Sequence, residues 1–353
     1  MTNPLVQLGS LGQSPWYDFI TRDLITSGEL ARLIADDGLR GMTTNPTIFE
    51  KAIGGSELYD EDIRRLASEG KRPAQIFEAV AVEDVRAACD LFLPVHRESG
   101  GMDGLVSMEV SPTLAHDTAG TIAEAERLWS RIARPNVMIK IPGTTAGLPA
   151  ITHCLSHGIN VNVTLLFAVR RYREVVDAFF AGLEQRLAAG HTVIGLASVA
   201  SFFVSRVDGK VGGGSAAIAN AAVAYQAFEE LFETSRWESL AARGAMVQRP
   251  LWASTSTKDP KLPDVYYVEA LIAPLTVNTL PPATFAAYRD HGNPQIRIRE
   301  AIAGASRVLD ELARAGLDLD QVTRTLEYEG VKSFAASFES LLKVIEQKAA
   351  VLV

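Results

Sequence analysis

The sequence lacks the features that define several large classes of protein. Only two of its 353 residues are cysteines, Cys89 and Cys154, which excludes a disulfide framework and a cysteine-built metal site and favours a reducing cytoplasm. No apolar run approaches the roughly 20 residues that span a membrane, and residues 1–15 lack the basic and apolar segments of a signal peptide. We therefore expect a cytoplasmic protein with no membrane partner.

An excess of positive charge is also missing. The formal net charge is -8 and the pI is near 5.4, so nucleic acid is not an expected partner. An anionic small ligand would need a local basic pocket. His153 and His157 have the spacing of metal ligands on a helix, but no carboxylate motif accompanies them, so we expect no metal site.

Apolar residues are abundant, at 47% of the chain against 22% charged, which is the profile of a globular protein with a sizeable core. Segments of strand type alternate with segments of helical type. The predicted strands lie at residues 16–20, 39–46, 105–110, 137–141, 159–165, 192–203, 249–254 and 276–280. Eight such units predict an α/β fold in which a parallel sheet closes into a (β/α)8 barrel. The alternative, an open doubly wound sheet, is less favoured because the glycine-rich turn after the first strand is missing.

Three segments lie outside this regular alternation. We expect residues 1–14 to form an N-terminal arm and residues 209–248 to form a helical insertion between the sixth and seventh strands. Residues 296–353 are expected to form closing helices. All three would belong to one domain that spans residues 1–353.

The strand predicted at residues 137–141 carries one lysine within an apolar run. Because side chains alternate along a strand, Lys140 shares one face with Met138, and the remaining apolar residues share the other. A lysine that has lost its hydration favours the neutral amine, which attacks carbonyl groups to form a Schiff base. The alternative is an edge-strand lysine that points toward water.

Other predicted strands have one polar face. The residues that share these faces include Thr43, Glu109, Asn162, Ser201 and Ser254. A polar barrel interior around a lysine predicts an active site. The alternative is a satisfied hydrogen-bond network in an ordinary core, or a solvent-facing antiparallel sheet.

Four motifs, at residues 43–47, 137–143, 160–167 and 201–206, occur in an order that resembles the transaldolase family, in particular its longer bacterial branch. The resemblance implies a class I, Schiff-base TIM barrel with extra helices. It also implies transfer of a dihydroxyacetone unit from sedoheptulose 7-phosphate to glyceraldehyde 3-phosphate, giving erythrose 4-phosphate and fructose 6-phosphate in the pentose phosphate pathway. No metal or organic cofactor is implied, and the partners are phosphorylated sugars.

The resemblance also implies roles for individual residues. Lys140 matches the nucleophile, Asp18 matches the carboxylate that exchanges a proton with the C4 hydroxyl, and Glu109 with Thr164 matches the pair that handles water during imine formation and hydrolysis. The residues expected to bind substrate are Asn45, Asn162, Ser201, Phe203, Arg206, Ser254 and Lys258. The family pattern has an arginine soon after the seventh strand, where this chain has Lys258 as the nearest cation.

Two other functions stay open from the sequence. A fructose 6-phosphate aldolase would release free dihydroxyacetone, but that related family tends to have glutamine at the position of Glu109 and tyrosine at that of Phe203, in shorter chains. A non-catalytic sugar-phosphate-binding barrel would be expected to have lost Lys140 or one of the two acids. The sequence predicts either a monomer or a homodimer.

Overall fold

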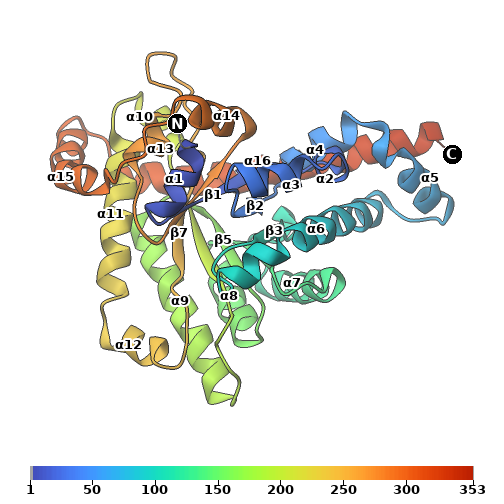
Figure 1. Cartoon of the computed structure of the whole chain (residues 1–353), viewed down its shortest axis with the longest axis horizontal. Helices are drawn as coiled ribbons and strands as arrows, with labels where there is room; N and C mark the ends of the chain where they lie inside the picture. Colours follow the sequence, from blue (N-terminus) through green and yellow to red (C-terminus); the bar gives the residue numbers. More distant parts are fainter. Residues whose placement is uncertain (1–2, 353) are drawn as a thin grey trace.

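The computed structural model describes residues 3–352. Within this range, parallel strands close into a barrel in the order β1 to β8 (Figure 1). The strands are β1 (Gln13–Asp18), β2 (Gly41–Thr43), β3 (Leu105–Glu109), β4 (Val137–Pro142), β5 (Val161–Leu166), β6 (Ser198–Phe203), β7 (Arg249–Ala253) and β8 (Thr276–Leu280). The predicted closed barrel is confirmed, and the open sheet is excluded because β1 pairs with β8.

Helices surround the barrel, as expected for crossovers between parallel strands. Those before β4 are α1 (Pro4–Ser10), α2 (Arg22–Thr26), α3 (Glu29–Asp36), α4 (Pro46–Gly54), the short 3-10 helix η1 (Glu57–Tyr59), α5 (Asp60–Ser68), α6 (Pro73–Glu98), the second 3-10 helix η2 (Pro112–Leu114) and α7 (Thr118–Ile132). Those after β4 are α8 (Gly147–Ser156), α9 (Val169–Ala188), α10 (Ser205–Val211), α11 (Ala216–Leu231), α12 (Ser235–Ala241), α13 (Tyr266–Ala270), α14 (Pro282–His291), α15 (Ile298–Arg314) and α16 (Leu319–Leu352).

Within the segment predicted as an N-terminal arm, residues 4–10 form the helix α1, and residues 1 and 2 lie outside the described residues. The helix α1 begins after Asn3, whose side chain accepts a hydrogen bond from the backbone N–H of Leu5 at 2.9 Å. Pro4 suits the first helical turn because its missing N–H would have no partner there. Leu5 and Leu8 are fully buried. The polar composition of this segment hid two leucines at helical spacing that anchor it to the core.

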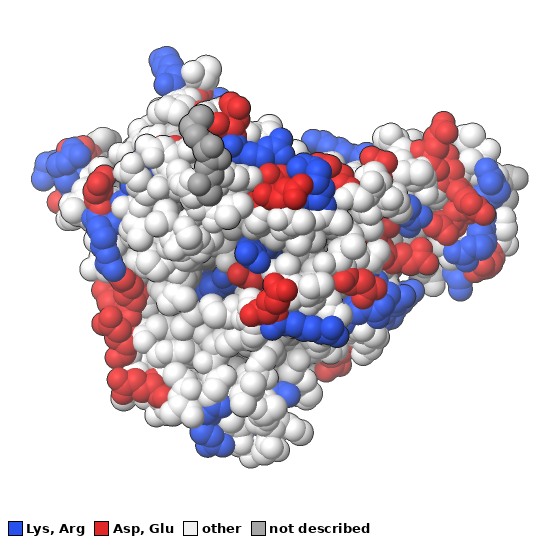
Figure 2. Space-filling view, viewed as in Figure 1, with Lys and Arg blue, Asp and Glu red and all other residues white. Residues whose placement is uncertain are grey.

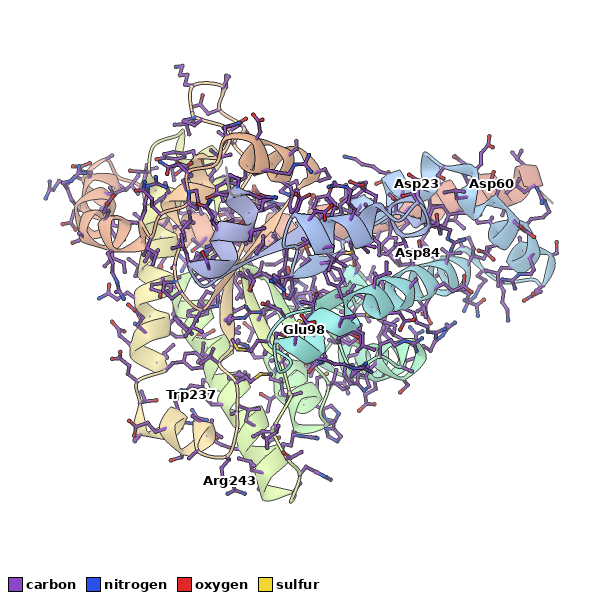
Figure 3. The ribbon with its side chains drawn as sticks, viewed as in Figure 1. Asp23, Asp60, Asp84, Glu98, Trp237 and Arg243 are labelled. Atoms are coloured by element: carbon purple, nitrogen blue, oxygen red, sulfur yellow. The ribbon has the colours of Figure 1, made fainter. Side chains whose placement is uncertain are left out.

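The segment expected as a helical insertion is the crossover between β6 and β7. Its long helical pattern divides into α11 and α12, with Thr234 capping α12. The helix α11 packs against α9 and α15 in the layer around the barrel. Trp237 of α12, labelled in Figure 3, stacks on Phe180 of α9 with ring centroids 5.8 Å apart. The two helices therefore complete the helical layer.

One side of the molecule projects from the barrel. Figure 1 shows α4, α5, α6 and the C-terminal part of α16 extending together to the right. Arg22 of α2 ties this part together through Asp62 at 2.6 Å and Asp84 at 2.9 Å. Figure 2 shows acidic and basic side chains interspersed over this projection, with no extended area of one sign on the face in view. No helix within residues 3–352 has the length and apolar content needed to cross a membrane.

The helix α16 crosses the C-terminal end of the barrel, which in this fold is the end that carries active sites. It packs against β5 and α4. At Gly330 the approach is so close that an added Cβ would lie 3.0 Å from Cδ2 of Leu165. This helix therefore forms part of the wall above the barrel mouth.

Candidate active site

Strand register brings the predicted lysine, one acid and one amide into a single layer. Glu109 of β3 pairs with Lys140 of β4, and Lys140 pairs with Asn162 of β5. In parallel strands, paired residues point to the same face of the sheet. The three side chains therefore enter the barrel side by side.

Lys140 is deeply buried, with 4% of its surface exposed. Its Nζ lies 3.4 Å from Oε2 of Glu109 and donates a hydrogen bond to the backbone oxygen of Thr44 at 3.2 Å. The ring of Phe334 from α16 lies above it, with the centroid 5.7 Å from Nζ. An amine enclosed in this way is held in one position and shielded from bulk water.

Burial raises the pKa of the Glu109 carboxyl group to about 7. The nearby Lys140 acts in the opposite direction and lowers this pKa, but burial has the larger effect. The Oε1 atom of Glu109 has no hydrogen-bond partner within residues 3–352. A buried polar atom without a partner costs free energy, and such atoms are concentrated where a ligand or water binds. A carboxyl group that titrates near neutrality can both donate and accept a proton under physiological conditions.

Asp18, at the end of β1, is held by a hydroxyl group of β2, which in turn contacts a hydroxyl group of β8. Thr43 of β2 donates to Oδ1 of Asp18 at 2.7 Å and also contacts the hydroxyl of Thr279 of β8 at 2.6 Å. Burial raises the pKa of Asp18, and the charges of Lys140 and Arg206 oppose that rise. The carboxyl group is therefore fixed in orientation and poised for proton exchange.

Thr164 lies where the pairing of β5 with β6 is irregular. The register shifts between Val163 and Leu166, and Leu165 has a φ of 61°. Bulges of this kind redirect side chains near active sites. Thr164 lines the same cavity as Lys140, and its Oγ1 has no hydrogen-bond partner in the described part of the chain.

The two predicted amides occupy different positions. The side-chain oxygen of Asn45 caps α4 by accepting from the N–H of Ile48 at 3.0 Å, so its amide NH₂ is left to face the cavity. Asn162 donates to Oγ of Ser107 at 2.9 Å and accepts from Oγ of Ser201 at 2.7 Å. Asn45 can therefore donate to a ligand, whereas Asn162 mainly holds Ser201 in place beneath the cavity.

A cavity of ≈ 530 Å³ opens above these groups. All but two of the predicted site residues line it; Glu109 and Asn162 contact lining residues instead. Arg206 of α10 and Lys258, in the loop after β7, line its rim together with Lys51 of α4. No carboxylate among residues 3–352 forms an ion pair with these three cations. The rim is therefore a local basic site in an acidic protein.

Other rim contacts fix the positions of predicted residues. The guanidinium of Arg206 lies 5.2 Å from the ring centroid of Phe203. Ser254 adopts a φ of 57°, and its hydroxyl lies 3.0 Å from that of Ser205. Burial lowers the pKa of Arg206, but a guanidinium keeps its charge.

The sequence did not point to Lys51, Phe334 or Thr279, although all three line the cavity. Lys51 and Phe334 lie on helices whose local patterns carry no sign of a site. Thr279 of β8 (Thr276–Leu280) shares a strand face with the apolar Val277, so period-two alternation gives no sign of it either.

Comparisons with known proteins agree over nearly the whole chain. Residues 15–345 match the family model described as transaldolase/fructose-6-phosphate aldolase. A protein named Transaldolase from Acidothermus cellulolyticus is 53% identical, with 98% of this chain and 96% of the relative covered. Proteins of the same name from Thermobifida fusca and Trichodesmium erythraeum are 47% and 45% identical, each with 99% of this chain covered, and with 99% and 98% of the relative covered. The chain belongs to the transaldolase/fructose-6-phosphate aldolase family.

Proposed function

We propose that this protein is a transaldolase that moves a dihydroxyacetone unit from sedoheptulose 7-phosphate to glyceraldehyde 3-phosphate, in the non-oxidative part of the pentose phosphate pathway. One observation carries the proposal: Lys140, buried beside Glu109, lines a cavity that is also lined by Asp18 and by three cations at its rim. Each group matches one requirement of the reaction. The compartment we expect is the cytoplasm.

Lys140 would attack the ketose carbonyl to form a carbinolamine. Glu109 would protonate the departing C2 hydroxyl, which leaves as water while the nitrogen lone pair forms the imine. For hydrolysis the same carboxylate would take a proton from a water held by Thr164, and the hydroxide would add to C2. A pKa of about 7 suits a group that works in both directions.

Asp18 would remove the proton of the C4 hydroxyl while the C3–C4 bond breaks and its electrons flow into the iminium. The aldose would then leave, and Asp18 would return the proton when the acceptor aldehyde reacts. The hydrogen bond from Thr43 holds the carboxyl group for both steps. Asn45, with its NH₂ free, is suited to bind an oxygen of the dihydroxyacetone unit.

The phosphate would bind at the rim, where Arg206 and Lys258 face the same cavity. Guanidinium and ammonium groups are the usual partners of phosphate in proteins. Ser254 would add a hydroxyl donor, whereas Ser201 already donates its hydroxyl hydrogen to Asn162. This site would allow donor and acceptor sugars to share one phosphate position.

The acceptor requirement tests the activity directly. Fructose 6-phosphate is supplied with and without erythrose 4-phosphate, and sedoheptulose 7-phosphate is measured together with free dihydroxyacetone. We expect rapid formation of sedoheptulose 7-phosphate only with the acceptor, and little free dihydroxyacetone in either case. Dihydroxyacetone released at the same rate without acceptor would instead identify an aldolase.

Borohydride trapping tests the residue. Reduction in the presence of fructose 6-phosphate should attach a dihydroxyacetone remnant to Lys140, located by peptide mass spectrometry. Labelling of a different lysine would refute the assignment. No labelling at all, with no sugar exchange, would favour a non-catalytic binding protein.

A further inference from the structure

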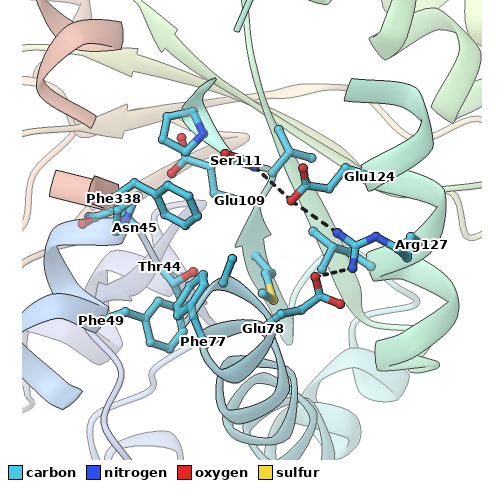
Figure 4. A pocket seen from close by; sticks show the side chains of 16 residues that line it. Thr44, Asn45, Phe49, Phe77, Glu78, Glu109, Ser111, Glu124, Arg127 and Phe338 are labelled. Carbon is cyan, nitrogen blue, oxygen red and sulfur yellow. Dashed lines mark hydrogen bonds and ion pairs between the residues drawn. The ribbon is translucent and has the colours of Figure 1, made fainter. Parts of the chain in front are cut away.

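A second cavity reaches the proposed active site from the side. It has a volume of ≈ 210 Å³ and lies outside the barrel, between β3 and the helices α4, α6, α7 and α16. Figure 4 shows Glu109 at one end of this cavity and the group of Glu78, Glu124 and Arg127 at the other. It adjoins the substrate cavity at Asn45, which lines both.

The inner end of this side cavity meets the lysine and its acid. Glu109 lines the side cavity, and its Oε2 lies 3.4 Å from Nζ of Lys140. Thr44, whose backbone oxygen accepts from the same Nζ, also lines it. The carboxyl side chain is 3% exposed, and its Oε1 has no hydrogen-bond partner among residues 3–352. A buried carboxyl oxygen without a protein partner requires water or a ligand.

The outer end is polar and reaches the surface. Arg127 is 46% exposed and forms ion pairs with Glu78 and Glu124. Glu124 also accepts a hydrogen bond from the backbone N–H of Ser111 at 3.2 Å. The charges of these groups compensate one another, so the entrance of the side cavity needs no charged ligand. Between the two ends the walls are apolar, formed by the side chains of Phe49, Phe77, Met108 and Phe338.

A bound sugar would block the movement of water through the opening of the substrate cavity. A donor whose carbonyl reaches Lys140 and whose phosphate reaches Arg206 occupies the length of the substrate cavity, and Phe334 covers the lysine from above. Yet each imine that forms must release one water, and each hydrolysis must consume one. The side cavity meets Glu109, the group that exchanges protons with that water, without crossing the sugar.

We propose that the side cavity is the route by which the water of the imine steps enters and leaves the site, with Glu109 as its inner end. This inference rests on the proposed function. The carbinolamine oxygen takes a proton from Glu109 and departs as water into the side cavity. In hydrolysis, water from the same cavity gives its proton to Glu109 and its hydroxide to C2. The narrow apolar middle admits water and excludes sugar, so the intermediate is hydrolysed without opening the mouth.

The test measures where released water goes. Fructose 6-phosphate labelled with oxygen-18 at C2 loses its label when the released water escapes, and keeps it when that water returns to the same carbon. Imine formation is measured separately by borohydride trapping. The informative quantity is the label lost per imine formed, which does not depend on the cleavage step.

Two variants narrow the route from opposite ends. Ala74→Trp adds a large side chain at the exposed end of α6, and Phe338→Trp enlarges the inner wall. In each, we expect the label lost per imine to fall by at least about threefold, because trapped water returns to the carbon it left. Trapping at Lys140 and the thermal unfolding midpoint should change little.

Ala123→Trp is the matched control. Ala123 is an exposed alanine of α7, and its side chain does not line the side cavity. The control should lose label as the unaltered protein does. Unchanged label loss in both Ala74→Trp and Phe338→Trp would show that water leaves by the mouth and would overturn the inference while leaving the transaldolase proposal intact. Absence of any trapped imine in the unaltered protein would overturn both.

Discussion

Each end of the barrel buries a basic side chain beside an acidic one, but the two basic side chains differ in how many hydrogen bonds the protein makes to them. At the N-terminal end, Arg249 donates to Oγ of Ser14 at 2.8 Å, to Oδ1 of Asp103 at 2.9 Å and to the backbone oxygen of Met102. At the mouth, Lys140 has one backbone acceptor and a looser contact of 3.4 Å with Glu109. The first pair is satisfied by the protein, and the second is not.

This difference separates a stabilising pair from a reactive one. A buried charge whose hydrogen bonds are all made by the protein holds strands together, and breaking it leaves its partner uncompensated. A buried charge with incomplete partners costs stability and has capacity left for a ligand. A substitution at the N-terminal end should therefore lower the free energy of unfolding, whereas a substitution at the mouth should lower the rate of the reaction.

The largest effect is expected from Lys140→Met. Removing the nucleophile should lower kcat/KM for sugar exchange by at least roughly 10⁴-fold, since the other two amines that line the cavity within residues 3–352, those of Lys51 and Lys258, lie at its rim. The thermal unfolding midpoint should not fall, because a buried charge is removed together with its desolvation cost. Exchange within tenfold of the unaltered rate would show that the mouth is not the reactive end.

Arg249→Met should reverse this pattern. Loss of the guanidinium leaves Asp103 and Ser14 without their partner, so the free energy of unfolding should fall by roughly 3 kcal/mol, measured by urea denaturation. The kcat of the folded enzyme should stay unchanged. Arg243→Met, at an exposed position labelled in Figure 3, is the control and should change neither quantity. A loss of kcat in Arg249→Met would mean that the two ends are coupled.

Asp18→Ala should separate two steps of the reaction, imine formation and carbon–carbon bond cleavage. Imine formation at Lys140 should be nearly unchanged, whereas C3–C4 cleavage should slow by about 100-fold, the usual scale for loss of a general base. Rapid-quench trapping and aldose release measure the two steps. Equal slowing of both steps would assign Asp18 a structural role through its hydrogen bond with Thr43.

The smallest effect concerns the pH dependence of Glu109. Its pKa is raised from 4.5 to about 7 in the folded protein, so the folded state holds a proton that the unfolded state releases. Stability should therefore fall as the pH rises from about 4.5 to about 7, and Glu109→Gln should lack this fall. Imine hydrolysis, which needs the carboxylate, should increase with pH through an inflection near 7. An inflection that persists in Glu109→Gln would assign it to another group.

The sequence alone predicted the parts of this protein that depend on local periodicity. Alternation of apolar and polar residues located the strands, and the apolar run of residues 137–141 marked Lys140 as a buried amine. The strand predicted at residues 276–280 agrees with β8 in both limits. Period-two and helical patterns arise from the backbone geometry of each segment, so they can be read without knowledge of its neighbours.

Only the tertiary structure decided which distant segments meet. Local patterns did not show that α16 crosses the mouth with Phe334 above Lys140, that Lys51 joins the basic rim, or that Leu5 and Leu8 anchor the first helix to the core. The path of the water route also depends on how four helices pack beside β3. Such contacts join residues far apart in the chain, and their geometry is set by the packing of whole elements, which no single segment encodes.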